Sequence, residues 1–117
     1  MQQSAGFSRL KRLTTATQFG QVFAEPMRSL DRYFTVLSRR NDANMARLGL
    51  TVSRRIAKRA VARNRLKRLA REVFRCQQNL PPLDFVIFAR KAAPEAENAV
   101  LRASLQRHFD GITKRTD

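Results

Sequence analysis

The chain contains few of the residues from which catalytic and metal sites are usually built. Among 117 residues there are one histidine, one cysteine and nine acidic residues, and the acids are scattered singly along the sequence. A single cysteine excludes an intramolecular disulfide framework, and no Cys/His cluster has the spacing of a zinc site. No carboxylate pair suits acid–base or metal chemistry, and four glycines exclude the usual glycine-rich phosphate loop. The sequence therefore predicts neither catalytic residues nor a metal site.

Long apolar runs are also missing. No segment approaches the roughly 20 apolar residues that span a membrane, and the first residues lack the apolar stretch of a signal peptide. Together with the single cysteine, these absences predict a cytoplasmic protein. Hydrophobic residues still make up 43% of the chain, enough for the small core of one domain. Short mobile basic tails are expected at about 1–6 and 111–117.

Positive charge is in excess, and it is concentrated in one segment. Lys and Arg total 24, and the formal net charge is +15. Residues 53–75 contain ten basic side chains and only one acid, so more than half of the excess lies there. Charge that served only solubility would be spread more evenly, so this segment is interpreted as an element that binds a polyanion.

An amphipathic pattern runs through the second half of the basic segment. Apolar residues recur at steps of three and four, which predicts a helix with one aliphatic stripe and a cationic opposite face. The stripe consists of Leu66, Leu69, Val73, Cys76 and Leu80, so the cysteine is predicted to pack in the core. The cationic face consists of Asn64, Lys67, Arg68, Arg71 and Arg75. Residues 53–61 show no clean period and are predicted to be a basic loop.

The other elements are predicted from local patterns. Residues 15–24 form a helix that Thr14 or Thr15 caps, and residues 32–39 and 47–52 form two strands, predicted to be a hairpin. Residues 83–89 form a strand that is buried on both sides or nearly so, and a last helix begins near Pro94. Its inner face is predicted to be Leu101, Leu105, His108 and Phe109. This order predicts an α+β or α/β sandwich of one small sheet.

Two aromatic features have both a structural and a functional interpretation. His108 shares helical spacing with apolar residues, so packing is favoured over catalysis. Phe19 and Phe23 lie about one helical turn apart, which by spacing alone favours a core position. Phenylalanines so placed are also compatible with a groove on which single-stranded bases stack.

Three blocks of sequence, taken together and in order, resemble those of a known protein family. The central block combines Gly-Leu-Thr-Val-Ser-Arg-Arg at 49–55 with Arg63-Asn64-Arg65-x-Lys67-Arg68. The upstream block has Arg12-Leu13, Phe19 and Val22-Phe23, and the downstream block is residues 84–91. In this order, the blocks closely resemble the protein subunit of bacterial ribonuclease P over roughly residues 7–109.

The resemblance implies a fold and a function. The fold would be an α+β two-layer sandwich like the second domain of ribosomal protein S5, with an unusual left-handed βαβ crossover that carries the basic helix. In this family the RNA subunit, with bound Mg²⁺, hydrolyses the phosphodiester bond that frees the mature 5′ end of transfer RNA. The protein binds the RNA subunit and the 5′ leader of precursor tRNA, and it raises substrate and metal affinity. Neither a membrane nor a small-molecule ligand is implied.

The resemblance also implies two sets of site residues. The predicted contacts with the RNA subunit are Arg54, Arg55, Arg59, Arg63, Asn64, Arg65, Lys67, Arg68 and Arg71. The predicted leader cleft is lined by Phe19, Phe23, Phe34 and Lys58. Leu37 stands where some family members have a tyrosine, a loss for which Phe34 or Tyr33 would have to compensate.

Three other functions share parts of this pattern. A ribosomal protein or RNA chaperone of the same fold would have the same composition, and only the three blocks argue against it. A self-sufficient protein nuclease is opposed by the lack of clustered acids and histidines. A DNA-binding regulator is opposed because no short helix and tight turn precede the basic helix.

Overall fold

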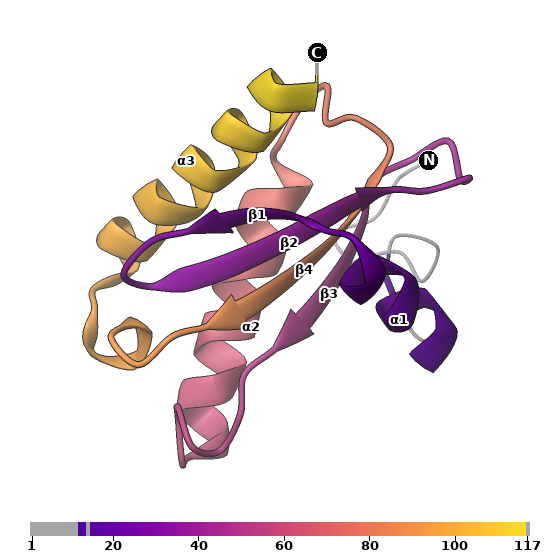
Figure 1. The fold of residues 1–117 in the computed structure, drawn as a ribbon. Helices are drawn as coiled ribbons and strands as arrows, with labels where there is room; N and C mark the ends of the chain where they lie inside the picture. Colours follow the sequence, from indigo (N-terminus) through magenta and orange to yellow (C-terminus); the bar gives the residue numbers. More distant parts are fainter. Residues whose placement is uncertain (1–11, 14, 117) are drawn as a thin grey trace, which may run out of the picture.

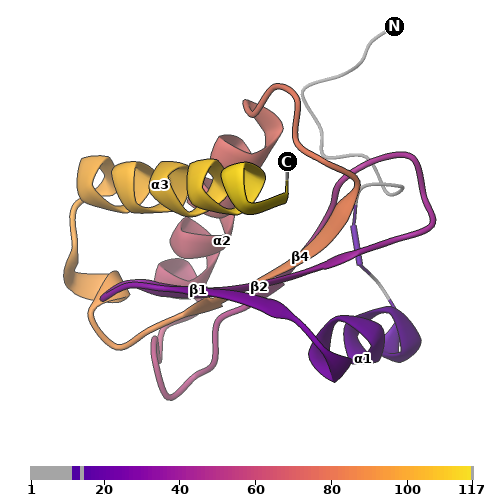
Figure 2. The same cartoon turned by 45° about the horizontal axis from the view of Figure 1, so that its top comes forward.

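The computed structural model describes residues 12, 13 and 15–116, which form a mixed sheet with helices on both faces (Figures 1 and 2). The strands are β1 (Met27–Leu30), β2 (Phe34–Arg40), β3 (Arg47–Thr51) and β4 (Leu83–Ala89). The helices are α1 (Ala16–Ala24), α2 (Ala60–Arg75), the short 3₁₀ helix η2 (Ala93–Glu95) and α3 (Asn98–Thr116).

The strand order is β1-β2-β4-β3, with β2 antiparallel to both of its neighbours and β3 parallel to β4. Helix α2 connects the two parallel strands. In Figure 1 both strands run toward the lower left and α2 lies behind the sheet, so this crossover is left-handed. The α+β class and the unusual crossover implied by the resemblance are therefore confirmed.

The main core lies between the sheet and the pair α2 and α3. Aromatic rings from three elements meet there edge to face, with centroid distances of 6.0 Å for Phe74–Phe85 and 5.4 Å for Phe85–Phe109. A smaller apolar cluster lies on the opposite face, where α1 packs on the sheet (Figure 2). Strand β4 contributes to both clusters because its side chains alternate between the faces.

The predicted hairpin of the second and third strands is wrong. Strand β4 lies between β2 and β3 and pairs with both, so β2 and β3 do not pair with each other. Alternation of apolar residues indicates which face of a strand is buried, but it carries no information about which strand is its partner. Strand β1 was not predicted. Met27–Leu30 has only four residues, and half-buried and exposed positions alternate along it, so the strand needs no clear apolar pattern in the sequence.

Two predicted boundaries also need correction. Helix α3 continues to Thr116 and Ile112 is fully buried, so residues 111–116 are not a mobile tail. Residues 1–6 lie outside the described part of the chain.

Helix α2 ends at Arg75, which leaves Cys76 exposed as its C-cap instead of packed in the aliphatic stripe. Leu80, the last member of that stripe, still packs against the core from the following loop.

An ion pair between the half-buried Arg47 and the buried Asp84 holds β3 beside β4. Arg47 donates from Nε and Nη2 to the two carboxylate oxygens of Asp84, at 2.8 and 2.9 Å. These two residues are register partners in the sheet, and Asn41 Nδ2 donates a third hydrogen bond to the same carboxylate at 2.7 Å. The hydrogen bond to Asp84 raises the pKa of Arg47 above its ordinary value, so the pair stays charged.

A polar cluster around Asp31 fastens α3 to the turn between β1 and β2. The carboxylate accepts hydrogen bonds from the backbone N–H groups of Tyr33 and Phe34, at 2.8 and 2.9 Å, and from the hydroxyl of Ser104. His108 is buried beside it, with Nε2 3.2 Å from the carboxylate and Nδ1 sharing a 2.7 Å hydrogen bond with the hydroxyl of Ser29. His108 thus occupies the packing position that its spacing predicted.

Acid stability should depend on Asp31. Burial raises the pKa of its carboxyl, but the hydrogen bonds from Ser104, Phe34 and Tyr33 outweigh burial, so the pKa lies below its ordinary value. A carboxyl with a lowered folded-state pKa stabilises the fold above about pH 4, and that contribution is lost as the pH falls through the folded-state value. We expect Asp31→Asn to melt at a lower temperature at neutral pH and to lose part of the acid-induced decline.

The contribution of Asp31 is measured by the melting temperatures of the unaltered chain and of Asp31→Asn at a series of pH values from neutral to acidic. Asp110→Asn is the matched control, because Asp110 is an exposed carboxylate of α3 whose described partner is only Gln106 on its own helix. An Asp31→Asn profile parallel to that of the unaltered chain would contradict the prediction.

Candidate RNA interface

Helix α2 presents its positive charge to solvent because its other face is buried in the core. The residues of α2 that pack inward are Leu66, Leu69, Ala70, Val73 and Phe74. On the outer face, Asn64, Arg68 and Arg75 are exposed, while Lys67 and Arg71 are half-buried. The predicted opposition of an aliphatic and a cationic face is therefore present.

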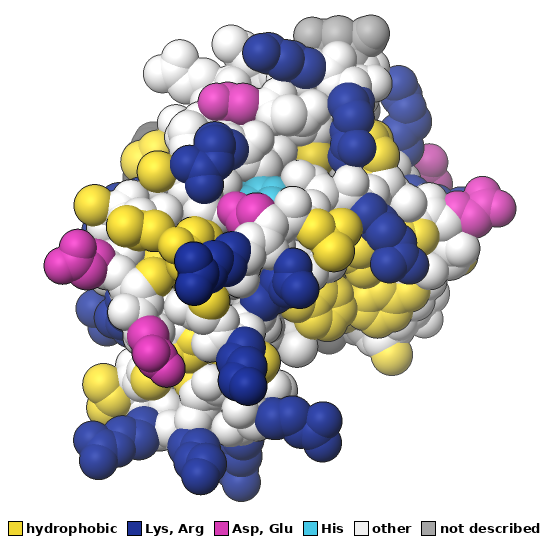
Figure 3. All heavy atoms as spheres, turned by 60° about the vertical axis from the view of Figure 1, so that its left-hand side comes forward, with side chains coloured by type: hydrophobic (Ala, Val, Ile, Leu, Met, Phe, Trp, Pro, Cys, Tyr) yellow, Lys and Arg dark blue, Asp and Glu magenta, His cyan; other side chains and the backbone are white. Residues whose placement is uncertain are grey.

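A basic loop precedes α2 and extends this surface. Arg54, Arg55, Lys58 and Arg59 are all exposed in the loop between β3 and α2. In Figure 3 this loop forms the lower end of the molecule, where Lys and Arg side chains gather. The loop is organised from within, since Arg63 donates from Nη1 to the carbonyl oxygens of Ala57 and Lys58, at 3.0 and 2.8 Å.

Arg65 is also engaged within the chain. Its guanidinium donates to the carbonyl of Pro94 at 2.9 Å, to the carbonyl of Ala96 at 3.4 Å and to Oδ1 of Asn98. These acceptors lie in η2 and at the start of α3, so Arg65 joins α2 to that junction. The Arg-Asn-Arg motif thus contains two arginines that brace the fold, whereas Asn64 between them is exposed.

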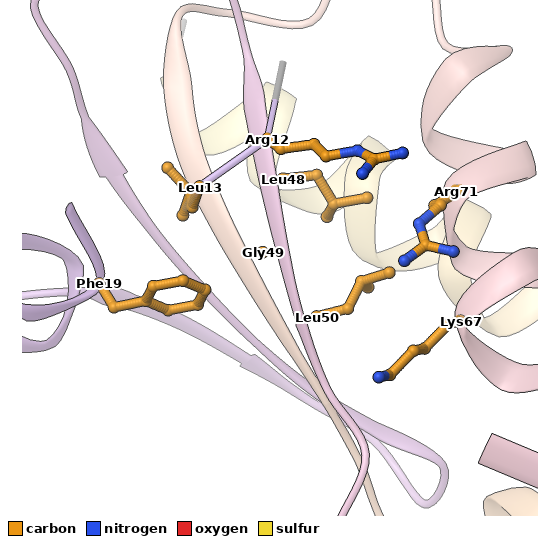
Figure 4. A pocket seen from close by; sticks show the side chains of 8 residues that line it. All are labelled: Arg12, Leu13, Phe19, Leu48, Gly49, Leu50, Lys67 and Arg71. Atoms are coloured by element: carbon orange, nitrogen blue, oxygen red, sulfur yellow. The ribbon is translucent and has the colours of Figure 1, made fainter. Parts of the chain in front are cut away.

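A small pocket lies over the edge strand β3 and connects the two faces of the sheet (Figure 4). Arg12, Lys67 and Arg71 project into it on the α2 side, and Phe19 lies on the other side of the strand. Burial and the nearby charge of Arg12 both lower the pKa of Arg71 below its ordinary value. None of the described residues that line this pocket is acidic, so its electrostatics favour an anion such as an RNA phosphate.

Helix α1 places phenylalanines against the sheet. A capping box fixes its start, in which Thr15 Oγ1 accepts from the Gln18 N–H at 3.1 Å and the Gln18 side chain accepts from the Thr15 N–H. The ring of Phe19 lies directly on Gly49 of β3, where a Cβ would be only 2.6 Å from the ring. Glycine inside a strand is the sequence signal for such a close approach.

Three phenylalanine rings form a continuous group on this face. The ring centroids of Phe19 and Phe23 are 6.3 Å apart, and those of Phe23 and Phe88 are 6.1 Å apart. Phe23 is 48% exposed despite its apolar ring, and Phe88 of β4 is half-buried. The structure brings together Phe19 and Phe23 as predicted for a cleft and adds Phe88, which the sequence patterns did not single out.

Phe34 does not belong to this group, and its prediction as a cleft residue is wrong. Its side chain is 1% exposed and lies in the main core, on the face covered by α2 and α3. Alternation along β2 places Thr35 and Leu37 on the α1 face instead. Leu37 is buried there beneath α1, and Lys58 lies in the loop before α2 and not on the sheet.

Comparisons with known proteins identify the family. The family model described as Ribonuclease P matches residues 7–113. The chain belongs to the ribonuclease P protein family. The ribonuclease P protein component of Thioalkalivibrio sulfidiphilus is 48% identical over 105 residues, which cover 89% of this chain and 88% of the relative.

Solved structures of ribonuclease P proteins share the fold. The Staphylococcus aureus RNase P protein superposes with a TM-score of 0.82 at 25% identity, covering 87% of this chain and 94% of that one. The RNase P protein from Thermotoga maritima gives a TM-score of 0.72 at 31% identity, covering 89% and 96%. As a member of this family, the chain is a protein subunit of ribonuclease P that acts in tRNA processing and associates with ribonuclease P RNA. Among the described helices, none is long and apolar enough to cross a membrane.

Arg65 and Arg68 should give separable effects when each is changed to alanine. Arg65→Ala removes hydrogen bonds between α2 and the η2–α3 junction, so we expect a loss of about 2 kcal/mol of stability, seen as a lower melting temperature. Arg68→Ala changes an exposed side chain, so we expect an unchanged melting temperature. Its affinity for ribonuclease P RNA should fall, and the slope of log affinity against log salt should decrease by about 0.7–0.9.

Lys114→Ala serves as the control for loss of charge, because Lys114 is an exposed cation of α3 outside the basic surface. A lower melting temperature for Arg68→Ala together with an unchanged one for Arg65→Ala would reverse the two assignments.

Proposed function

We propose that the chain is a noncatalytic subunit that binds two RNAs on different sides of its sheet. The ribonuclease P RNA docks on the outer face of α2 and the loop before it. The 5′ leader of precursor tRNA lies on the α1 face. The placement of a cationic helix on one side and exposed phenylalanines on the other carries this proposal.

The docking surface for the RNA subunit is argued from charge and geometry. The exposed side chains of Arg54, Arg55, Arg59 and Arg68 can each present a guanidinium fork to a phosphate, and Asn64 adds an amide. Arg63 and Arg65 hold the loop and the helix in place for these contacts. The surface belongs to a packed helix and to a loop that Arg63 holds against it, so little ordering is needed when RNA binds.

The leader site is argued from the exposed aromatic rings. Bases of a single strand can stack on phenylalanine, whereas paired bases in a duplex are inaccessible to such rings. The leader is a single-stranded segment that the precursor has and mature tRNA lacks, so this face would favour precursor over mature tRNA. Lys67 and Arg71 in the pocket over β3 would bind leader phosphates where the two RNA surfaces meet.

The chemistry is assigned to the RNA subunit. In the described part of the chain, no three His, Cys, Asp or Glu side chains lie close enough to hold a metal ion, so Mg²⁺ is assigned mainly to RNA. When bound there, Mg²⁺ supplies the activation of water for phosphodiester hydrolysis. The cationic surface offsets repulsion between the two RNAs, which would raise affinity for the substrate and for the metal. We place this assembly in the cytoplasm.

Reconstitution tests the proposal. The purified chain is combined with a bacterial ribonuclease P RNA, and cleavage of precursor tRNA is followed at low Mg²⁺ concentration. We expect cleavage by the complex where the RNA alone is nearly inactive, and no cleavage by the protein alone. Two results would contradict the proposal: the absence of stimulation, or RNA-free cleavage that survives repurification. Co-purification with ribosomes in place of one abundant RNA would favour a ribosomal role.

A further inference from the structure

Helix α1 covers only part of its face of the sheet. It packs over Leu37 and Val86, and beyond these two residues, toward Phe88, the described part of the chain leaves the side chains of this face half-buried or exposed. One row of register partners crosses all four strands in this part: Leu30 pairs with Thr35, Thr35 with Phe88, and Phe88 with Thr51. Leu30 is 57% exposed, and the other three residues are half-buried. Phe88 is therefore the aromatic centre of a partly exposed transverse row.

The neighbours of Phe88 add a second aromatic ring and two hydroxyl groups to this row. Phe23 borders it from α1 with its ring 6.1 Å from that of Phe88, and the planes are tilted by 34°. The hydroxyl groups of Thr35 and Thr51 flank the phenylalanine on the two adjacent strands. An aromatic ring between hydroxyl groups suits a ligand with a flat face and polar edges, as a nucleobase has.

The surrounding charge is also complementary to RNA. Arg28, on the same face of β1, is exposed, and Lys67 and Arg71 lie across the edge strand β3. The acid of β4 that shares the α1 face, Asp84, is buried in its pair with Arg47 at the opposite end of the strand. A protein partner would need a larger apolar area than Leu30, Phe23 and Phe88 supply.

We propose that Phe88, together with Phe23, stacks one unpaired base of the 5′ leader and that Thr35 and Thr51 contact the edges of that base. This assignment rests on the proposed leader site and makes Phe88 a residue that determines leader preference. The two rings contact each other directly, so the base lies over them and not between them. The family blocks place Phe19 and Phe23 in the cleft but assign no such role to Phe88.

The test uses the complete holoenzyme with substitutions at Phe88. Phe88→Leu keeps an apolar side chain but removes the ring, and Phe88→Tyr keeps the ring. Precursor tRNAs carry a fluorescent adenine analogue, quenched by stacking, at one leader position at a time. We expect one position to be quenched by the unaltered holoenzyme and by Phe88→Tyr, but not by Phe88→Leu. Affinity of Phe88→Leu for precursor tRNA should fall on the order of tenfold, with mature tRNA binding unchanged.

Two further variants keep the test decisive. Val100→Ala, at an exposed apolar position of α3 outside this face, should leave quenching and affinity unchanged. If Phe88→Leu melts far below the unaltered chain, Thr35→Val replaces it, since it removes only a hydroxyl and should reduce discrimination between bases at the quenched position. Equal discrimination by Thr35→Val would then overturn the proposal.

The outcomes separate this inference from the proposed function. If the unaltered holoenzyme binds precursor and mature tRNA equally, the leader site itself fails and the role of Phe88 falls with it. If the precursor is preferred and Phe88→Leu retains both quenching and affinity, only the assignment of Phe88 is wrong. Equal weakening of precursor and mature tRNA binding by a folded Phe88→Leu would also overturn it.

Discussion

Packing of the aliphatic face of α2 against the sheet determines where the charge of this protein lies. Ten cations lie within residues 53–75, six of them in α2 itself, and their mutual repulsion would destabilise this helix in isolation. Burial of Leu66, Leu69 and Phe74 stabilises the helix by a few kcal/mol per fully buried side chain and fixes its rotation about its own axis. The polar positions then face outward together, and the helix presents the cationic surface that we propose as the docking site.

The second constraint is the position of β4 at the centre of the sheet, where every side chain except the half-buried Phe88 is buried. Its side chains alternate, with Phe85 and Ile87 under the helices and Val86 and Phe88 toward α1. The sheet therefore separates two hydrophobic layers, one on each of its faces. The layer under α2 and α3 anchors the basic helix, while on the other face the described part of the chain places only the nine-residue α1. Under the proposed function, the two RNAs would therefore lie on opposite sides of one small sheet and meet only at its edge strand.

The edge strand β3 links these two sides. The left-handed crossover begins at β3 and leads into α2, which brings Lys67 and Arg71 close to the edge of the strand. Gly49 allows Phe19 to approach the same strand from the other side. The pair between Arg47 and Asp84 secures the strand where it begins. A change at this edge would therefore affect both proposed RNA surfaces.

Local sequence predicted most of the elements but not how they pair. The stripe of α2, the cap of α1 at Thr15 and the doubly buried β4 follow from short-range periodicity, and the structure contains all three. Strand pairing and the burial of Phe34 depend on contacts between residues far apart in sequence, which no local period encodes. The bracing role of Arg65 was missed for the same reason, because its acceptors lie about 30 residues away in the chain.

Cross-linking in the assembled holoenzyme tests the central claim that the two RNAs occupy different sides of the sheet. A photoreactive uridine is placed either in the leader of precursor tRNA or in the RNA subunit, and the modified peptides are identified by mass spectrometry. We expect leader adducts in α1 and β4 and RNA-subunit adducts in α2 and the loop before it. Leader adducts confined to the outer face of α2, with RNA-subunit adducts on α1 and β4, would contradict this claim.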